Sequence, residues 1–175
     1  GISTGVLNVG DLMYDATLHA LSVIASNPKK YELVKRSSKP FCLCTIHRAE
    51  TTDYPTKLKE AFDFINSYTD DYDIIFPLHP RTLARAKDYG IALPKAQLLE
   101  PLGYFEIHAL LQKSELVLTD SGGLQKEAYF HRVPCITMRQ ETEWIETIDH
   151  GWNRLWKETT YQTRKVIMEY GTGNS

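Results

Sequence analysis

Short apolar runs alternate with segments of helical periodicity along this chain. The apolar runs have the length of strands and are rich in Ile, Leu, Val and Cys: residues 41–46, 73–78, 97–99, 115–119, 134–138 and 153–155. Strands this short and this apolar are typical of a parallel sheet buried on both faces. The alternation with helices predicts a Rossmann-like, three-layer α/β/α domain.

The intervening segments carry apolar residues at the spacing of one helix face. Asp11 is a suitable N-cap for a first helix that we expect to run to about Lys35. The second helix contains Leu58 and ends near Tyr68. Further helices are predicted over residues 81–89, 104–113, 123–131, 143–150 and from the last strand to about Glu169.

Composition and charge limit the classes of protein to which this chain can belong. The chain has 175 residues, 42% of them hydrophobic and 24% charged, which suits a single globular domain. The formal net charge of -2 gives no reason to expect nucleic-acid binding, which usually needs a basic surplus. No apolar run is long enough to span a bilayer, so we expect no membrane association. The chain starts at Gly1 without Met and ends in turn residues, which favours a fragment of a larger protein.

Three cysteines are present, and Cys42 and Cys44 stand two positions apart on a predicted strand. That spacing places both side chains on one face, where they are poorly set for a disulfide. A metal site would need more ligands, and His47 is the only nearby candidate. Buried, reduced thiols of a cytoplasmic protein are the simpler interpretation, and neither a metal nor a cofactor is expected.

Polar residues, glycines and prolines are concentrated in the turns that follow the strands. These turns include residues 47–50, 79–81, 100–103, 120–123 and 139–142. In a parallel α/β sheet, ligands bind beyond the carboxyl ends of the strands, where such turns meet. The sequence therefore predicts a binding site at that edge.

The turn Asp120-Ser121-Gly122-Gly123 joins a strand to a helix and carries the most specific signal. Paired glycines at a helix start let a ligand approach the backbone, and the free amides with the helix dipole favour an anion. The Ser121 hydroxyl could donate to a phosphate oxygen, and Glu127 could accept hydrogen bonds from ribose hydroxyls. The alternative is a tight turn in which Ser121 is a plain N-cap.

Two histidines belong to the same predicted edge. His47 follows the first core strand and could contact a diphosphate or transfer a proton, or could simply cap a helix. His79 is followed by Pro80, which favours a role in stiffening the turn. The histidines on predicted helices, namely His19, His108, His131 and His150, need no functional explanation.

Several segments resemble the non-hydrolysing UDP-N-acetylglucosamine 2-epimerases. They are Asp120 to Ala128, His47-Arg48-Ala49-Glu50, Pro101-Leu102-Gly103-Tyr104, and Arg139 with Thr142-Glu143. The resemblance covers residues from about Val9 to Leu155 in order. It implies one half of a two-domain fold like that of B-type glycosyltransferases, with residues 1–175 as the C-terminal, nucleotide-sugar-binding domain and the N-terminal domain absent.

The resemblance also implies roles for individual residues. His47 would contact substrate as a catalytic residue, Ser121, Gly122, Gly123 and Glu127 would hold diphosphate and ribose, and Leu102 and Ile107 would lie beside the uracil. Arg139, Glu143 and Trp144 are expected to line the cleft. Trp144 stands where Arg is usual in the family, and the run Thr142 to Glu146 looks more like the branch that acts on UDP-2,3-diacetamido-2,3-dideoxy-glucuronate. Ala49 replaces the second Arg of the family's His-Arg-Arg-Glu.

The reaction implied is inversion at C2 of a UDP-sugar, with UDP leaving by elimination and adding back. The carboxylates that move the proton in the family belong to the N-terminal half, so the chain alone is expected to be inactive. The full-length protein is expected to be a homodimer. Two alternatives remain: a glycosyltransferase C-terminal domain, which would not need His47, and a nucleotide-binding regulatory module, which would bind UDP tightly without a partner domain.

Overall fold

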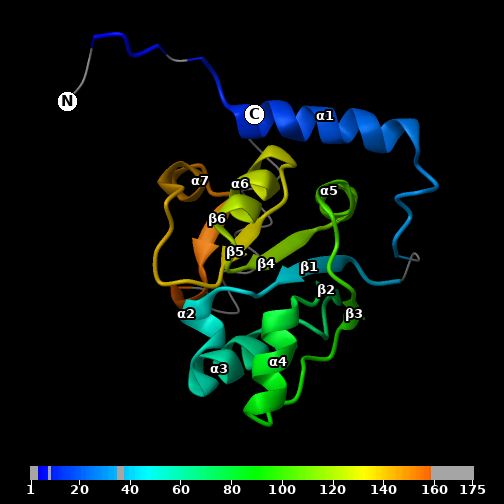
Figure 1. The fold of residues 1–175 in the computed structure, drawn as a ribbon, viewed down its shortest axis with the longest axis vertical. Helices are drawn as coiled ribbons and strands as arrows, with labels where there is room; N and C mark the ends of the chain where they lie inside the picture. The colour runs from blue at the N-terminus through cyan, green and yellow to red at the C-terminus, as the bar shows by residue number, and fades with distance from the viewer. Residues whose placement is uncertain (1–3, 8, 35–37, 159–175) are drawn as a thin grey trace.

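The computed structural model describes residues 4–7, 9–34 and 38–158. Within these residues one sheet runs in the order β3-β2-β1-β4-β5-β6, and every neighbouring pair is parallel (Figure 1). The strands are β1 (Phe41–Thr45), β2 (Asp73–Pro77), β3 (Gln97–Leu99), β4 (Leu116–Thr119), β5 (Cys135–Thr137) and β6 (Asn153–Leu155). The predicted parallel sheet is confirmed.

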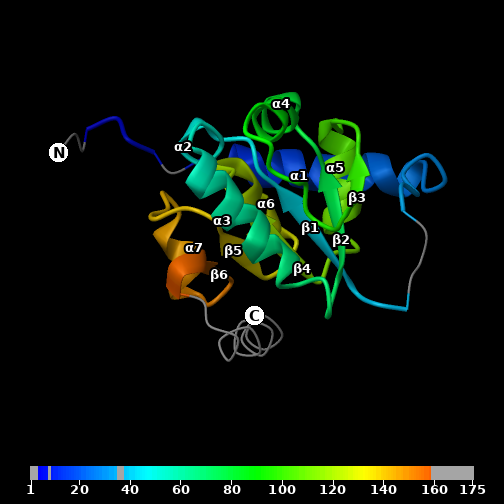
Figure 2. The same cartoon turned by 90° about the horizontal axis from the view of Figure 1, so that it is seen from below.

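Helices cover both faces of the sheet. They are α1 (Leu12–Ser26), α2 (Ala49–Thr52), α3 (Pro55–Asn66), α4 (Pro80–Asp88), α5 (Tyr104–Leu111), α6 (Gly122–Phe130) and α7 (Ile145–Asp149), with a 3-10 turn, η1, at Trp156–Glu158. Helices α3 and α4 lie on one face and α5 and α6 on the other, while α1 lies across the outside of α5 and α6 (Figures 1 and 2). This arrangement confirms the predicted Rossmann-like, three-layer domain. No helix in the described ranges has the length and apolar character needed to cross a membrane.

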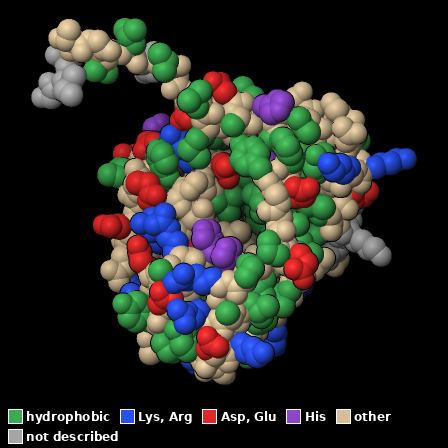
Figure 3. All heavy atoms as spheres, in the orientation of Figure 1, with side chains coloured by type: hydrophobic (Ala, Val, Ile, Leu, Met, Phe, Trp, Pro, Cys, Tyr) green, Lys and Arg blue, Asp and Glu red, His purple; other side chains and the backbone are tan. Residues whose placement is uncertain are grey.

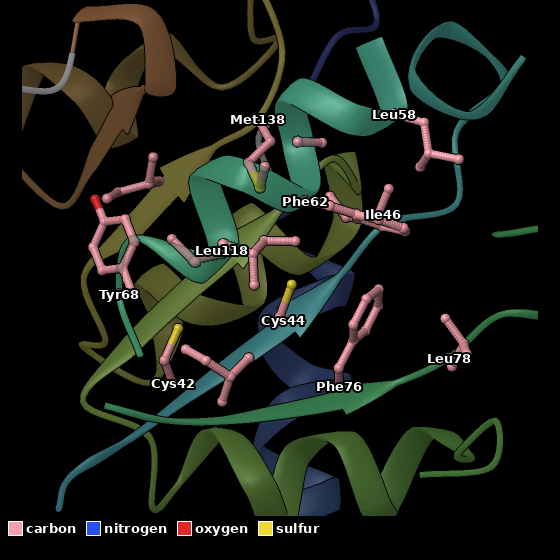
Figure 4. Close-up of a cluster of buried hydrophobic side chains, with 14 of the residues drawn as sticks. Cys42, Cys44, Ile46, Leu58, Phe62, Tyr68, Phe76, Leu78, Leu118 and Met138 are labelled. Atoms are coloured by element: carbon pink, nitrogen blue, oxygen red, sulfur yellow. The ribbon is translucent and has the colours of Figure 1, made fainter. Parts of the chain in front are cut away.

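Alternate residues of the central strands enter two separate cores, as a sheet covered on both faces requires. Cys42 and Cys44 point toward α3 and pack with Phe62 and Phe76 (Figure 4). Between them, Leu43 points the other way, toward α5 and α6. All three cysteines are buried and free, and burial raises the pKa of the Cys135 thiol to about 12. The predicted shared face of the two strand cysteines is confirmed.

Two features differ clearly from the prediction, and a third prediction lies partly outside the described residues. Helix α1 ends at Ser26 rather than near Lys35, because Asn27 precedes Pro28 and takes a non-helical conformation (φ -139, ψ 57). The short helix α2 was not predicted, since one turn directly after a strand has too few residues to show helical periodicity. Of the helix expected after β6, residues 156–158 form η1 and the rest lies outside the described residues.

The strand order creates a reversal between β1 and β4. From β1 the chain proceeds to α2 and α3 on one face, whereas from β4 it proceeds to α6 on the other. The hydroxyl oxygens of Thr45 and Thr119, paired at the ends of these strands, lie 2.6 Å apart. Ligands of open α/β sheets bind in the crevice at such a reversal.

Candidate functional site

A pocket of about 430 Å³ opens at the carboxyl edge of the sheet, beyond β1 and β4. Figure 3 shows this side of the molecule hollowed near its middle, beside histidine side chains. Six residues that were predicted from the sequence line the pocket: His47, Leu102, Ile107, Ser121, Gly123 and Glu127. A larger cavity of about 930 Å³ lies at the amino edge, beside Phe41 and Asp73, away from all of these residues.

The start of α6 presents free backbone amides at this pocket. Ser121 is the N-cap, and its hydroxyl oxygen accepts the Leu124 amide at 3.5 Å. The Gln125 amide is bonded to the Ser121 carbonyl at 3.4 Å. Within the described part of the chain, no bond of this kind uses the amides of Gly122 and Gly123. Ser121 is thus a cap and also lines the pocket, so the two interpretations of this residue are compatible.

Asp120, just before this turn, organises the loop after β1. Its carboxylate is fully buried and accepts the backbone amides of His47 and Arg48, the latter at 2.9 Å. Burial raises the pKa of Asp120, and the hydrogen bond from Arg48 and the nearby His47 oppose the rise. The Nδ1 atom of His47 lies 3.7 Å from Asp120 Oδ1, which leaves the opposite edge of the ring for the pocket.

His79 supports the predicted stiffening of its turn. Its Nδ1 atom accepts the Arg81 amide at 3.2 Å, so His79 caps α4, whose first residue is Pro80. The ring also lines the pocket, with its centroid 5.6 Å from that of His47. The two imidazoles therefore form one wall of the site.

Arg139 and Glu143, which the family resemblance placed in the cleft, lie beside the start of α6 and do not line the pocket. Arg139 Nη1 donates to Glu143 Oε2 at 2.6 Å, and Arg48 Nη2 lies 3.7 Å from Glu143 Oε1. Burial alone would raise the pKa of Glu143, but its own amide and the Arg139 side chain hold it below the usual value. A methyl group on Gly122 would collide with the Glu143 carboxylate, so this carboxylate rests against the helix start.

Trp144 ties the same loop to α6. Its indole nitrogen donates to the Gly122 carbonyl at 2.7 Å, and the Lys126 ammonium lies 4.0 Å from the centre of the ring. Lys126 in turn pairs with Asp11 at 2.6 Å. Trp144 thus supports the turn from outside the pocket, because its ring is engaged with the first residues of the helix.

Sequence reasoning missed a polar pair behind Glu127. His108 on α5 is completely buried, and its Nδ1 atom lies 2.7 Å from Nε2 of His131, the C-cap of α6. The other ring nitrogen of His108 lies 3.7 Å from Glu127 Oε1. A histidine within the apolar run from Ile107 to Leu111 was the signal for such a partner. Asp120 was also missed as an organising residue, although it stood in the predicted turn.

Comparison with known proteins extends this picture. The family described as UDP-N-acetylglucosamine 2-epimerase matches residues 1–170. A UDP-N-acetylglucosamine 2-epimerase homolog of Methanococcus maripaludis is 43% identical over 162 residues, which cover 89% of this chain and 44% of that protein. The UDP-2,3-diacetamido-2,3-dideoxy-D-glucuronate 2-epimerase of Pseudomonas aeruginosa is 42% identical over 151 residues, covering 86% and 41% respectively.

A solved structure agrees with the sequence matches. The crystal structure of Methanocaldococcus jannaschii UDP-GlcNAc 2-epimerase in complex with UDP-GlcNAc and UDP superposes with a TM-score of 0.82 at 34% identity. The match covers 95% of this chain and 50% of that chain. This chain therefore spans about half the length of the relatives it matches. It belongs to the UDP-N-acetylglucosamine 2-epimerase family.

Proposed function

We propose that this chain is the UDP-binding half of a UDP-sugar 2-epimerase. The observation that carries the proposal is the start of α6, where the amides of Gly122 and Gly123 stand at the reversal between β1 and β4. His47 and Glu127 line the same pocket. A helix start of this kind binds phosphate through its amides and its dipole.

In the proposed complex, the diphosphate lies against the start of α6 and the ribose hydroxyls bond to Glu127. The uracil lies against Leu102 and Ile107, which line the same pocket and pack on the core below it. For the diphosphate to reach the Gly122 amide, the Glu143 carboxylate must move aside, because both groups are anionic. Arg48 and Arg139, which now face Glu143, remain beside the position of the phosphates.

The contribution of this half to the reaction is stabilisation of the leaving group. Elimination places negative charge on the departing UDP, and preoriented amides with a nearby imidazole stabilise such charge. Asp120 fixes the loop that carries His47, and the His47 ring faces the pocket. The base that removes the C2 proton is supplied by the rest of the full-length enzyme, so the chain alone binds UDP weakly and does not turn over substrate.

For the sugar, we favour the branch that acts on UDP-2,3-diacetamido-2,3-dideoxy-glucuronate. The support is Trp144 in place of the usual Arg, together with the 42% identity to the Pseudomonas aeruginosa enzyme named for that substrate. The full-length protein acts in the cytoplasm, in the supply of sugars for a surface polysaccharide, and dimerises through its other half.

An NMR titration of the isotope-labelled chain tests the binding half of the proposal. UDP should shift the amide signals of Gly122, Gly123 and His47 at millimolar concentration, and UMP should bind more weakly. Incubation with either UDP-sugar should give no epimer. Absence of shifts at these amides would contradict the binding site, and turnover by the chain alone would contradict its assignment as one half of the enzyme.

Replacement of His47 by Ala in the full-length enzyme separates epimerase from glycosyltransferase. The epimerase should lose its activity while still binding UDP. A transferase that shares the diphosphate site would keep most of its activity.

A further inference from the structure

A series of polar side chains, His131, His108 and Glu127, runs from behind the pocket to its lining, and we call it the polar path. His108 has none of its surface exposed, and its ring lies between those of Tyr104 and His131, at centroid distances of 4.3 Å and 5.0 Å. Its Nε2 atom has no hydrogen-bond partner among the described residues. A buried polar group in this state is destabilising, so its retention calls for an explanation.

The protons on this path can be assigned by chemistry. Burial, assisted by the neighbouring His108, lowers the pKa of His131 to about 4, so His131 is neutral near pH 7. The 2.7 Å separation between Nδ1 of His108 and Nε2 of His131 therefore holds one shared proton. The remaining question is which ring donates.

With both rings neutral, only one direction suits the carboxylate at the end of the path. If His131 donates, a neutral His108 keeps its proton on Nε2 and directs it at Glu127 Oε1, 3.7 Å away. If His108 donates instead, its Nε2 lone pair faces the carboxylate, and two acceptors are buried against each other. The second arrangement is unfavourable because an unpaired acceptor in the protein interior loses its hydration.

We propose that the His131–His108 pair positions the Glu127 carboxylate so that it can accept hydrogen bonds from both ribose hydroxyls of the bound nucleotide. The inference rests on the proposed function, which assigns the ribose to Glu127. The 3.7 Å separation is longer than a hydrogen bond and closes by a small rotation of the carboxylate when the ribose engages it. His108 is thus a positioning residue that never touches the ligand, and its effect is confined to the ribose.

The tautomer of each histidine can be observed directly in the unmodified chain. Long-range ¹H–¹⁵N NMR spectra of ¹⁵N-histidine-labelled protein should show both His108 and His131 protonated on Nε2. His108 protonated on Nδ1 would overturn the proposal, whatever the behaviour of any variant.

Binding measurements test the functional consequence. His108→Leu should weaken binding of UDP about tenfold, the effect of one hydrogen bond to a charged group, and should leave binding of 2′,3′-dideoxy-UDP unchanged. His108→Gln, whose amide nitrogen can replace Nε2, should restore most of the affinity for UDP. His19→Leu, on the exposed side of α1, serves as the control and should alter neither ligand.

The outcomes separate this inference from the proposed function. If the unmodified chain binds UDP but His108→Leu weakens both ligands equally, or neither, the positioning role is wrong and the UDP site stands. If the unmodified chain binds neither ligand, the proposed function fails and the ribose role of Glu127 fails with it.

Discussion

Asp120 holds His47 from the neighbouring strand, with both carboxylate oxygens 3.1 Å from the His47 backbone nitrogen. The two residues are 73 positions apart in the sequence and come together because β1 and β4 are neighbours. The same carboxylate accepts the Arg48 amide, so the turn that begins the proposed phosphate site also shapes the loop that faces it. One buried side chain therefore couples the two halves of the pocket.

Asp120→Asn should destabilise the fold by about 2 kcal/mol, because an amide group replaces one acceptor oxygen and faces N–H donors in the interior. Urea unfolding checks this expectation. Asp63→Asn is the matched control, since the Asp63–Lys59 pair is exposed on α3 and should contribute less than about 1 kcal/mol. Equal unfolding midpoints for the two variants would contradict the organising role of Asp120.

Acidification should destabilise the chain through His131. This histidine has its pKa lowered from 6.5 to about 4 in the folded state, so the unfolded chain binds the additional proton between these values. Stability from this group is therefore complete above about pH 6.5 and is lost as the pH falls toward 4, by about 2 kcal/mol after allowance for partial exposure.

Urea unfolding of the wild type and His131→Gln at two pH values isolates this contribution. Between about pH 7 and pH 4.5, the wild type should lose more stability than the variant, which keeps the donor to His108 but cannot titrate. The effect of Asp120 is present in both proteins and cancels in the comparison. Identical losses would show that His131 does not carry the dependence.

Replacement by Ala should have different effects on stability at Gly122 and at Gly123. A Cβ at Gly123 meets nothing within 4 Å, so Gly123→Ala should stabilise the unliganded chain by about 0.5 kcal/mol. It should also weaken UDP binding, because the methyl group occupies the space that a phosphate needs against the backbone.

Gly122→Ala should instead displace the Glu143 carboxylate. The free energy of unfolding of the Gly122→Ala protein should therefore be about 1 kcal/mol lower than that of the Gly123→Ala protein. Thermal unfolding and a UDP titration of both variants check the pair. A Gly123→Ala protein that binds UDP as well as the wild type would argue against phosphate contact at this helix start.

Two tryptophans offer a matched test of the loop that follows β5. Trp144→Phe removes the bond to the Gly122 carbonyl and should cost about 1 kcal/mol. Trp156→Phe should be neutral or slightly stabilising, because the Trp156 indole nitrogen is buried without a hydrogen-bond partner among the described residues, and the ring contact with Phe64 can be kept. Chemical denaturation of both variants gives the comparison. The reverse ranking would contradict the role of Trp144.

Much of the fold was predictable because a strand buried on both faces consists of a short run of apolar residues. The apolar runs around Leu43, Ile75 and Val117 predicted a sheet covered on both faces, and the two cores confirm it. The predicted end of α1 was wrong because Pro28 disfavours a helical conformation at Asn27, where the helix stops. Strand order is set by packing between distant segments, so the alternation alone could not place β1 beside β4.

The site was predictable where function depends on a local turn and hidden where it depends on distant contacts. The glycines before Leu124 predicted a helix start that a ligand can approach, and this turn lies at the pocket. The apolar run around His108 indicated a buried partner, but nothing local identifies that partner as the His131 ring 23 residues away. The bond from the Trp144 indole to the Gly122 carbonyl likewise joins residues 22 positions apart.

The reversal in strand order also has a kinetic consequence. The α6 start and the loop of His47 become one site only when β1 pairs with β4, and that contact joins Thr45 and Thr119, which are 74 positions apart in the sequence. Long-range closures of this kind form slowly. A nucleotide added during refolding should therefore bind only after β1 and β4 have paired, so the onset of nucleotide binding reports when the two parts of the site come together.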